Sequence, residues 1–312
     1  MTQDWYRRTS GQWIPVLGVA PEPPAPEPPP PGEITHGTQL TVDMVGLPAG
    51  WSGTNSGAIV STHDGQTIEN RNVDVSSGPA IEIRHNNVTV QYCRVSHRSG
   101  ANGVVIVSGV TGATVQFNHF NGHYRTSEGN FGSIGVLSYG AAYTYRNFFQ
   151  GGRDGTHPYG RYNQFVENWV DDLHKNPGAH NDAVHMGGRQ GRSDVVIARN
   201  RVVAGSPGGI DLYPRHGPLQ GVDIFDNYVV GKGVGFGIRG GRTPFHDHSN
   251  NTDIRIEGNR FSGTFGYPDA LGEGTNAGVD TSKPGHTWVN NRWVDGSSDL
   301  PARCGVTSNA CD

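Results

Sequence analysis

Cysteine, positive charge and long apolar runs are all scarce in this sequence. Three cysteines are too few for a disulfide scaffold. The net charge of −4 does not suit a nucleic-acid partner, which requires concentrated lysine and arginine. No apolar segment approaches the length of a membrane span, and no continuous apolar stretch follows the basic pair near the N-terminus. We therefore expect no nucleic-acid partner, no membrane span and no secretory signal.

Cofactor-binding motifs are missing as well. The sequence contains no Walker loop, dinucleotide fingerprint or nucleophile elbow, and we predict no cofactor. Cys304 and Cys311 are separated by six residues, so they could close a small loop in an oxidising setting or remain free thiols. The spacing does not choose between these two states.

Helical periodicity is also nearly absent, and a short strand motif recurs in its place. Most copies are followed by an alternating pair such as Trp169-Val170. The copies end 21 to 32 residues apart, a period that indicates a repeat architecture. The nine terminal positions are Asn72, Cys93, Asn118, Asn147, Asn168, Asn200, Asn227, Asn259 and Asn291.

This repeat predicts an all-β, single-domain, right-handed parallel β-helix of about nine coils, one per motif. Asparagine tolerates left-handed turn geometry, and a stack of amides can bond along the helix axis. Cys93 would fill one rung at the cost of one amide link. An antiparallel sandwich with ordinary turn asparagines is the alternative. The constant offset between strand and asparagine favours the β-helix, because hairpins do not require one.

The N-terminal part has a composition of its own. Residues 21–32, PEPPAPEPPPPG, predict a semi-rigid polyproline II linker. Residues 1–20 before it are too few to bury a core, so we interpret them as an extended docking peptide; the alternative is a disordered leader. Its docking residues would be Trp5, Tyr6, Trp13 and Ile14.

The β-helix is predicted to cover residues 33–296, followed by an irregular tail over 297–312. An exposed first coil would leave unpaired strand edges and open core. We therefore expect residues 35–51 to cap the open end of the solenoid.

One predicted coil is dense in titratable side chains, among them Asp172, His180, Asp182 and His185. A cluster of this kind suits acid–base chemistry or a metal. In a straight strand, however, His185 has the opposite parity to His180 and Asp182, so we predict no metal site. The alternative role for these side chains is capping of turns by hydrogen bonds to the backbone.

Strand alternation predicts a row along one outer face. If Val184, Met186, Ile210 and Leu212 face the core, their neighbours face outward on successive coils. Aligning these strands would place His185 beside Asp211 and Tyr213 beside Arg239. His185, Asp211 and Arg239 are our candidate catalytic residues, and Tyr213, Asp182, His180 and Asp172 are candidate substrate-binding residues. Tyrosine offers a face to a sugar ring, and histidine or arginine could act on a uronate. Solvated side chains on a strand face would look the same.

Two resemblances extend this interpretation. The N-terminal pattern of aromatic peptide and proline stalk resembles the minor tail proteins of bacteriophages that infect Actinobacteria. The body resembles pectate-lyase-like β-helix proteins, which include tailspike depolymerases and polysaccharide lyases. The most specific stretch is ENWVDDLHKNPGAHNDAVHMGG at residues 167–188, and the matching segments cover about a third of the chain.

These resemblances imply a tail protein that projects a β-helix rod and binds glycan of the host cell envelope. Its partners would be other tail proteins and the polysaccharide, it would reside in the virion after assembly in the host cytoplasm, and a homotrimer is a compatible assembly. The alternative function is a depolymerase, either a polysaccharide lyase or a glycoside hydrolase.

Overall fold

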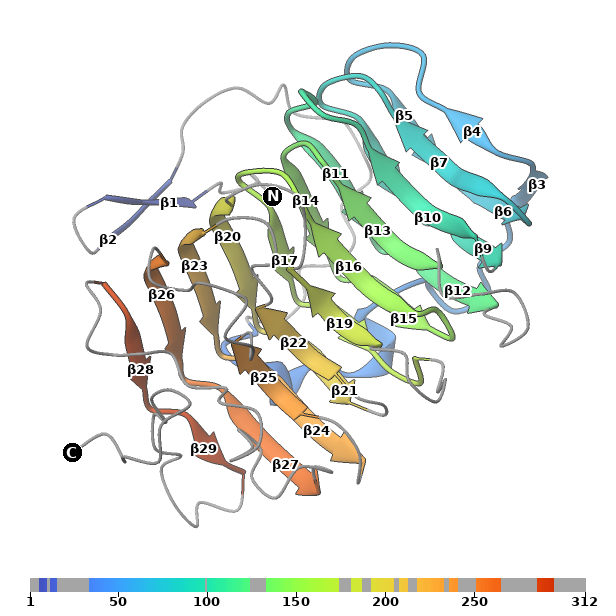
Figure 1. The fold of residues 1–312 in the computed structure, drawn as a ribbon. Coiled ribbons are helices and arrows are strands. Elements are labelled where there is room, and N and C mark those ends of the chain that lie inside the picture. The colour runs from blue at the N-terminus through green and yellow to red at the C-terminus, as the bar shows by residue number, and fades with distance from the viewer. Residues whose placement is uncertain are drawn as a thin grey trace.

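The computed structural model describes residues 6–9, 12–15, 34–98, 100–123, 133–173, 181–186, 192–204, 208–212, 218–232, 236–240, 251–264 and 285–294. Its body consists of three parallel sheets of eight, nine and ten strands (Figure 1). From β3 to β27, successive strands enter the three sheets in turn, so every third strand pairs with its counterpart in the next coil. The prediction of an all-β parallel β-helix of about nine coils is confirmed, and no α-helix occurs in the described ranges.

The eight-stranded sheet carries the candidate site. Its strands, in spatial order, are β4 (Ile59–Val60), β7 (Gly78–Ile83), β10 (Ala101–Ile106), β13 (Ile134–Ser138), β16 (Asp154–Pro158), β19 (Asp182–His185), β22 (Gly208–Leu212) and β25 (Phe236–Gly240).

The nine-stranded sheet follows it along the chain. Its strands are β5 (Thr67–Glu69), β8 (Thr89–Gln91), β11 (Ala113–Gln116), β14 (Ala142–Tyr145), β17 (Gln164–Val166), β20 (Arg192–Ala198), β23 (Leu219–Phe225), β26 (Thr252–Glu257) and β28 (Thr287–Val289).

The ten-stranded sheet completes each coil. Its strands are β3 (Thr54–Ser56), β6 (Arg71–Val75), β9 (Arg94–Arg98), β12 (His119–His123), β15 (Phe148–Gln150), β18 (Trp169–Val170), β21 (Arg201–Ala204), β24 (Tyr228–Lys232), β27 (Arg260–Thr264) and β29 (Arg292–Trp293).

The core is a set of columns that run along the axis, because in-register strands place equivalent side chains over one another. One column from the ten-stranded sheet is almost fully buried throughout. Within it, the rings of Phe120 and Phe149 stack with centroids 4.7 Å apart. Its members are Val73, Val95, Phe120, Phe149, Val170, Val202, Val229 and Phe261.

The predicted asparagine ladder is present at the turn before the ten-stranded sheet. From Asn118 onward, each Nδ2 donates to the Oδ1 of the next rung at 2.9–3.2 Å, and each backbone N–H donates to the same oxygen at 2.8–3.0 Å. Cys93 starts the ladder by donating its backbone N–H to Asn118 Oδ1 at 2.9 Å. Burial raises the pKa of the Cys93 thiol to about 11. Cys93 therefore acts as a small buried side chain.

The expected reason for asparagine at this turn was wrong in one respect. The left-handed backbone conformation belongs to the residue before each rung, with φ between 50° and 69°. These residues are chemically varied: Tyr92, Phe117, Arg146, Glu167, Arg199, Asp226, Gly258 and Asn290. Left-handed geometry is costly for most of them. Asparagine is therefore required for its buried amide. The hydrogen bonds of this amide offset the energetic cost of the left-handed conformation in the preceding residue.

Asn72 is not a rung, so that assignment is corrected by one residue. Asn72 pairs in register with Arg94, which places Arg71 beside Cys93. The Asn72 side chain instead bonds to Asn55 Oδ1 at 2.7 Å on the exposed edge of the first coils. In the motif IENRN, Asn70 is the left-handed residue and Arg71 takes the position of the rung, so alignment by residue type selected Asn72, one position too far.

Residues 34–54, here called the strap, run lengthwise along the turns that precede the ten-stranded sheet. The expectation that residues 35–51 cap the open end is therefore wrong. The strap contains two short 3₁₀ helices, η1 (Gly37–Gln39) and η2 (Val42–Met44). Its donors bond the carbonyls of left-handed turn residues over many coils: His36 to Gly258, Gly37 to Asp226, Gly46 to Arg146, Trp51 to Tyr92 and Thr54 to Asn70.

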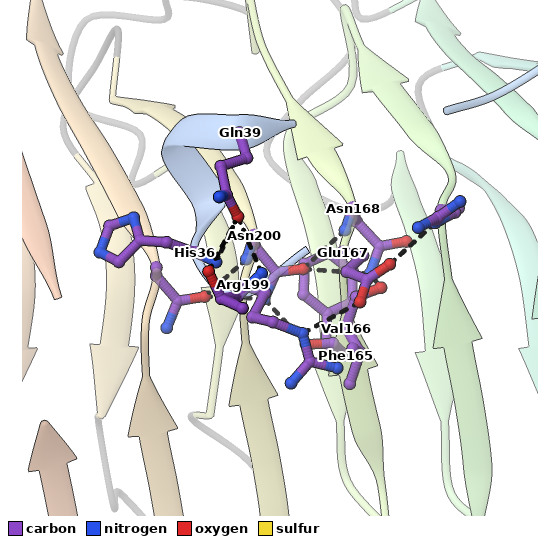
Figure 2. A network of polar contacts seen from close by, with 11 residues as sticks. His36, Gln39, Phe165, Val166, Glu167, Asn168, Arg199 and Asn200 are labelled. Atoms are coloured by element: carbon purple, nitrogen blue, oxygen red, sulfur yellow. Dashed lines mark hydrogen bonds and ion pairs between the residues drawn. The ribbon is translucent and has the colours of Figure 1, made fainter. Parts of the chain in front are cut away.

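Figure 2 shows where the strap meets the ladder and a charged column beside it. Glu167 accepts from Arg146 Nε at 2.8 Å and from Arg199 Nε at 2.9 Å. Glu167 and Arg146 are buried, so neither charge is left to solvent. Arg146, Glu167 and Arg199 are the left-handed turn residues of three successive coils. Their side chains thus pair their charges outside the ladder.

β1 (Tyr6–Thr9) and β2 (Gln12–Pro15) form an antiparallel pair in which Thr9 lies opposite Gln12. The docking segment thus contains a hairpin, whereas we expected an extended peptide. Trp5 lies outside the described residues, and only the backbone of Tyr6, Trp13 and Ile14 is described. The linker and the C-terminal tail, with Cys304 and Cys311, also lie outside the described ranges.

Candidate functional site

The candidate site lies on the outer side of β16, β19 and β22, and it is built from a repeated spacing. Asp154 and His157 in β16 recur as Asp182 and His185 in β19. Between the second pair, Ala183 and Val184 are both buried in the core. A straight strand would turn one of two adjacent residues outward. The strand therefore bends here, and residues three apart reach the same side.

His185 is the centre of the cluster. Its Nδ1 lies 2.9 Å from Asp182 Oδ2 and 3.3 Å from Asp211 Oδ2. Both carboxylate side chains are fully buried, whereas the His185 side chain is 16% exposed. His185 is thus the member of this trio that reaches the surface.

A second layer lies one coil earlier. His157 Nε2 lies 2.8 Å from Asp154 Oδ2, and His157 Nδ1 lies 2.8 Å from the hydroxyl of Tyr159. The His157 and His185 rings are 4.8 Å apart between centroids. Asp154 Oδ1 also accepts the backbone N–H of Asp182 at 2.9 Å, which joins the two layers.

The protonation states of the two layers differ. Burial lowers the pKa of His157 to about 4 despite its contact with Asp154, and the hydrogen bond from His157 helps to lower the pKa of Asp154 against the opposing effect of burial. At neutral pH a neutral His157 therefore donates its Nε2–H to the Asp154 carboxylate and accepts the Tyr159 hydroxyl proton at Nδ1.

His185 behaves in the opposite way. Burial lowers its pKa, but hydrogen bonds to Asp182 and Asp211 outweigh burial and raise the pKa to about 10. Burial and the charge of Asp211 raise the pKa of Asp182 to about 7. The proton shared between His185 and Asp182 resides on His185, because two carboxylates face the same ring nitrogen.

Two buried residues beside His185 carry polar atoms without a hydrogen-bond partner in the described part of the chain. These atoms are Asp182 Oδ1 and both side-chain polar atoms of Asn181, and both residues are almost completely buried. An unpaired buried polar atom costs about 1–3 kcal/mol. Such a cost is typical of functional sites.

Asp182, His185 and Asp211 also place one ligand atom each within 4.8 Å of one another, a spacing that a divalent cation could occupy. In the structure, however, His185 Nδ1 makes both short contacts as a hydrogen-bond donor. We therefore describe the trio as a charge-assisted hydrogen-bond cluster.

The predicted row is only partly assembled by described residues. The backbone register of His185 with Asp211 is confirmed, and so is the burial of Val184, Met186, Ile210 and Leu212. Arg239 pairs in register with Asp211, so the expectation that it lies beside Tyr213 was wrong. Asp182 joins the cluster, contrary to the parity argument, because of the bend at Ala183 and Val184. His180, Tyr213 and the side chain of Arg239 lie outside the described residues.

Asp172 lies apart from this cluster in its recorded contacts. It is exposed, has a left-handed backbone, and its N–H bonds the Asp171 carboxylate at 2.7 Å. Its carbonyl accepts from Gly151 N at 2.9 Å. Asp172 thus contributes its backbone to a turn that the Asp171 side chain caps.

Three residues of the site were missed by the sequence analysis: Asp154, His157 and Tyr159. A signal for two of them is present in the sequence, since DGTH at 154–157 and DAVH at 182–185 share the Asp-x-x-His spacing in neighbouring coils. This repeated spacing indicates a shared site only when the register between the two coils is known.

The fold defines a parallel β-helix protein with a buried carboxylate and imidazole cluster on one sheet. No protein-family model, curated protein or solved structure matches the chain. Among the residues described, no helix is long and apolar enough to cross a membrane.

Proposed function

We propose that the protein binds an extended glycan along the outer side of the eight-stranded sheet and cleaves it by acid catalysis at His185. One observation carries the proposal: two fully buried carboxylates face one nitrogen of a histidine that reaches the surface. This arrangement orients the ring and stabilises its protonated form.

Adhesion alone gives no reason for such a cluster. Burying Asp182 and Asp211 side by side is costly, and ionic groups exposed on a strand face would bind sugar hydroxyls without that cost. Strongly shifted pKa values beside a histidine are more typical of catalytic centres than of binding surfaces.

The proposed role of His185 is to protonate the leaving oxygen of the glycosidic bond from Nε2 while Nδ1 keeps its proton toward the carboxylates. The glycosidic C–O bond breaks as the leaving oxygen takes this proton, and water adds to the anomeric carbon. The proton that the water loses returns to Nε2, which restores the protonated ring. Asp182 and Asp211 thus act chiefly by holding His185.

Incubation of the full chain with envelope polysaccharide tests this function. Turnover should fall 10²- to 10⁴-fold in His185→Ala with little loss of binding. His63→Ala, which changes an exposed histidine outside the cluster, is the matched control and should leave turnover unchanged. Binding without any cleavage by the wild type would instead support a pure adhesin, and unsaturated products would indicate a lyase.

We also propose that the chain is a phage minor tail protein, attached to the virion through residues 1–20. The hairpin of β1 and β2 favours a docking role, because an isolated two-stranded hairpin is only marginally stable and gains stability by packing on a partner. Deleting residues 1–32 should abolish incorporation into particles while the β-helix remains folded. Normal incorporation of the truncated chain would contradict this attachment.

A further inference from the structure

A pair of surface tyrosines lies next to the histidine cluster. Tyr139 follows β13 directly and Tyr159 follows β16, and the last residues of these strands, Ser138 and Pro158, are partners in register. The two rings approach to 5.6 Å between centroids at an interplanar angle of 58°. Tyr139 is 46% exposed and Tyr159 is half-buried. The pair thus offers aromatic surface to solvent from two neighbouring coils.

The backbone beneath these rings is held rigidly. The N–H of Tyr139 donates to Ile106 O at 2.8 Å, and the N–H of Tyr159 donates to Ser138 O at 2.6 Å. A Cβ added to Gly160 would lie 2.1 Å from Gly140 O, so the two turns stack without space between them. A ligand that stacks on these rings would therefore meet a pre-organised surface, which lowers the entropic cost of binding.

The tyrosine pair is connected to the proposed catalytic centre. The Tyr159 hydroxyl lies 2.8 Å from His157 Nδ1, and the His157 ring lies 4.8 Å from the His185 ring. Tyr159 is one coil before His185 and Tyr139 is two coils before it, an axial distance of roughly 10 Å at about 4.8 Å per coil. A short oligosaccharide that reaches His185 can extend over both rings.

We propose that Tyr139 and Tyr159 form a subsite that stacks against uncharged pyranose units of the glycan bound at His185. The inference rests on the proposed function for the position of the cleaved bond, while the stacking itself does not require cleavage. Tyrosine presents an apolar ring with a polar edge, which matches the mixed surface of a sugar. Asp154, Asp182 and Asp211 would repel an acidic sugar beside this subsite, and the guanidinium of Arg153 already lies 3.4 Å from Asp154.

The test measures dissociation constants by affinity electrophoresis in gels that contain mannan, galactan or xylan, with polygalacturonate as the acidic polysaccharide. Tyr139→Ala should weaken binding to the best neutral ligand about five- to tenfold, and Tyr139→Phe should retain it, because the ring provides the contact. Tyr162→Ala is the matched control, since Tyr162 is similarly exposed at 44% but packs under Arg161, farther along the turn that follows β16. Its affinity should match the wild type.

The outcomes separate this subsite from the catalytic proposal. Unchanged affinity in Tyr139→Ala, an equal loss in Tyr162→Ala, or wild-type binding to polygalacturonate alone would overturn the subsite, even if His185→Ala abolished cleavage. Failure of the wild type to bind any of the neutral polysaccharides would overturn it too. Weakened binding in Tyr139→Ala without any cleavage by the wild type would support the subsite and refute catalysis.

Discussion

Replacing Asn200 by alanine removes a rung from the middle of the ladder, and the structure allows the loss to be estimated. The Asn200 side chain donates to Phe165 O at 2.8 Å and to Asn227 Oδ1 at 2.9 Å. Its Oδ1 accepts the N–H of Asn168 at 2.8 Å and the Nδ2 of the same residue at 3.2 Å. All of these groups are buried, so water cannot replace the missing partner.

The substitution leaves the buried N–H of Asn168 unsatisfied, and the carbonyl of Phe165 and the Oδ1 of Asn227 each lose a donor. At about 1–3 kcal/mol for the unsatisfied N–H and about 0.5–1.5 kcal/mol for each other lost hydrogen bond, the free energy of unfolding should fall by about 2–6 kcal/mol. Asn72→Ala is the control, because Asn72 makes one recorded contact, to Asn55 at 2.7 Å, in an exposed region. Its loss should be about 1 kcal/mol or less.

Urea unfolding followed by circular dichroism measures both variants. The denaturant dependence should stay the same for the two proteins if each remains folded as a β-helix. Equal reductions in the free energy of unfolding for Asn200→Ala and Asn72→Ala would refute a ladder whose strength depends on buried neighbours on both sides.

Three further predictions concern charge, pH and the strap. Glu167→Gln should lower the free energy of unfolding by about 3–5 kcal/mol, because it leaves the buried Arg146 uncompensated; an unchanged urea midpoint would contradict this. Burial lowers the pKa of His97 from 6.5 to about 4, so unfolding takes up a proton between these values and stability should decrease as the pH falls from 6.5 to 4. His97→Gln should make that decrease shallower, and an identical pH profile would exclude His97 as its source. Gly37→Ala places a Cβ 2.2 Å from Asn200 O and should release the strap, seen as faster limited proteolysis within it; wild-type protease resistance would show that the backbone accommodates the methyl group.

The fold was predictable because its main signal is local and repeated. A strand, a turn and a buried amide recur at each rung, so one error, at Asn72, did not affect the rest of the register. The path of the strap was not predictable in this way. Its partners are backbone carbonyls, whose availability depends on the conformation of residues such as Asp226 and Arg146 and leaves no trace in side-chain identity.

The candidate site was predictable only where strand alternation holds. Alternation placed His185 beside Asp211, and the register agrees. It failed for Asp182 because two adjacent core residues bend the strand, and it gave no reason to connect Asp154 or His157 with the next coil. Asp154 and His157 lie one coil before Asp182 and His185. The sequence does not show this relation, because the number of residues between rungs varies from coil to coil.

Because of the ladder, the register between neighbouring coils does not depend on the number of residues in each coil. Consecutive rungs are 25, 29, 21, 32, 27, 32 and 32 residues apart, yet the amide contacts between them are nearly identical. Extra residues in a longer coil are therefore accommodated outside the paired strands, and the turn before each rung accepts side chains as different as Tyr92 and Glu167. Such a chain can gain or lose loop segments, or whole coils, without other substitutions among its core residues. Recognition of a new ligand can then evolve on the rod's surface independently of its stability.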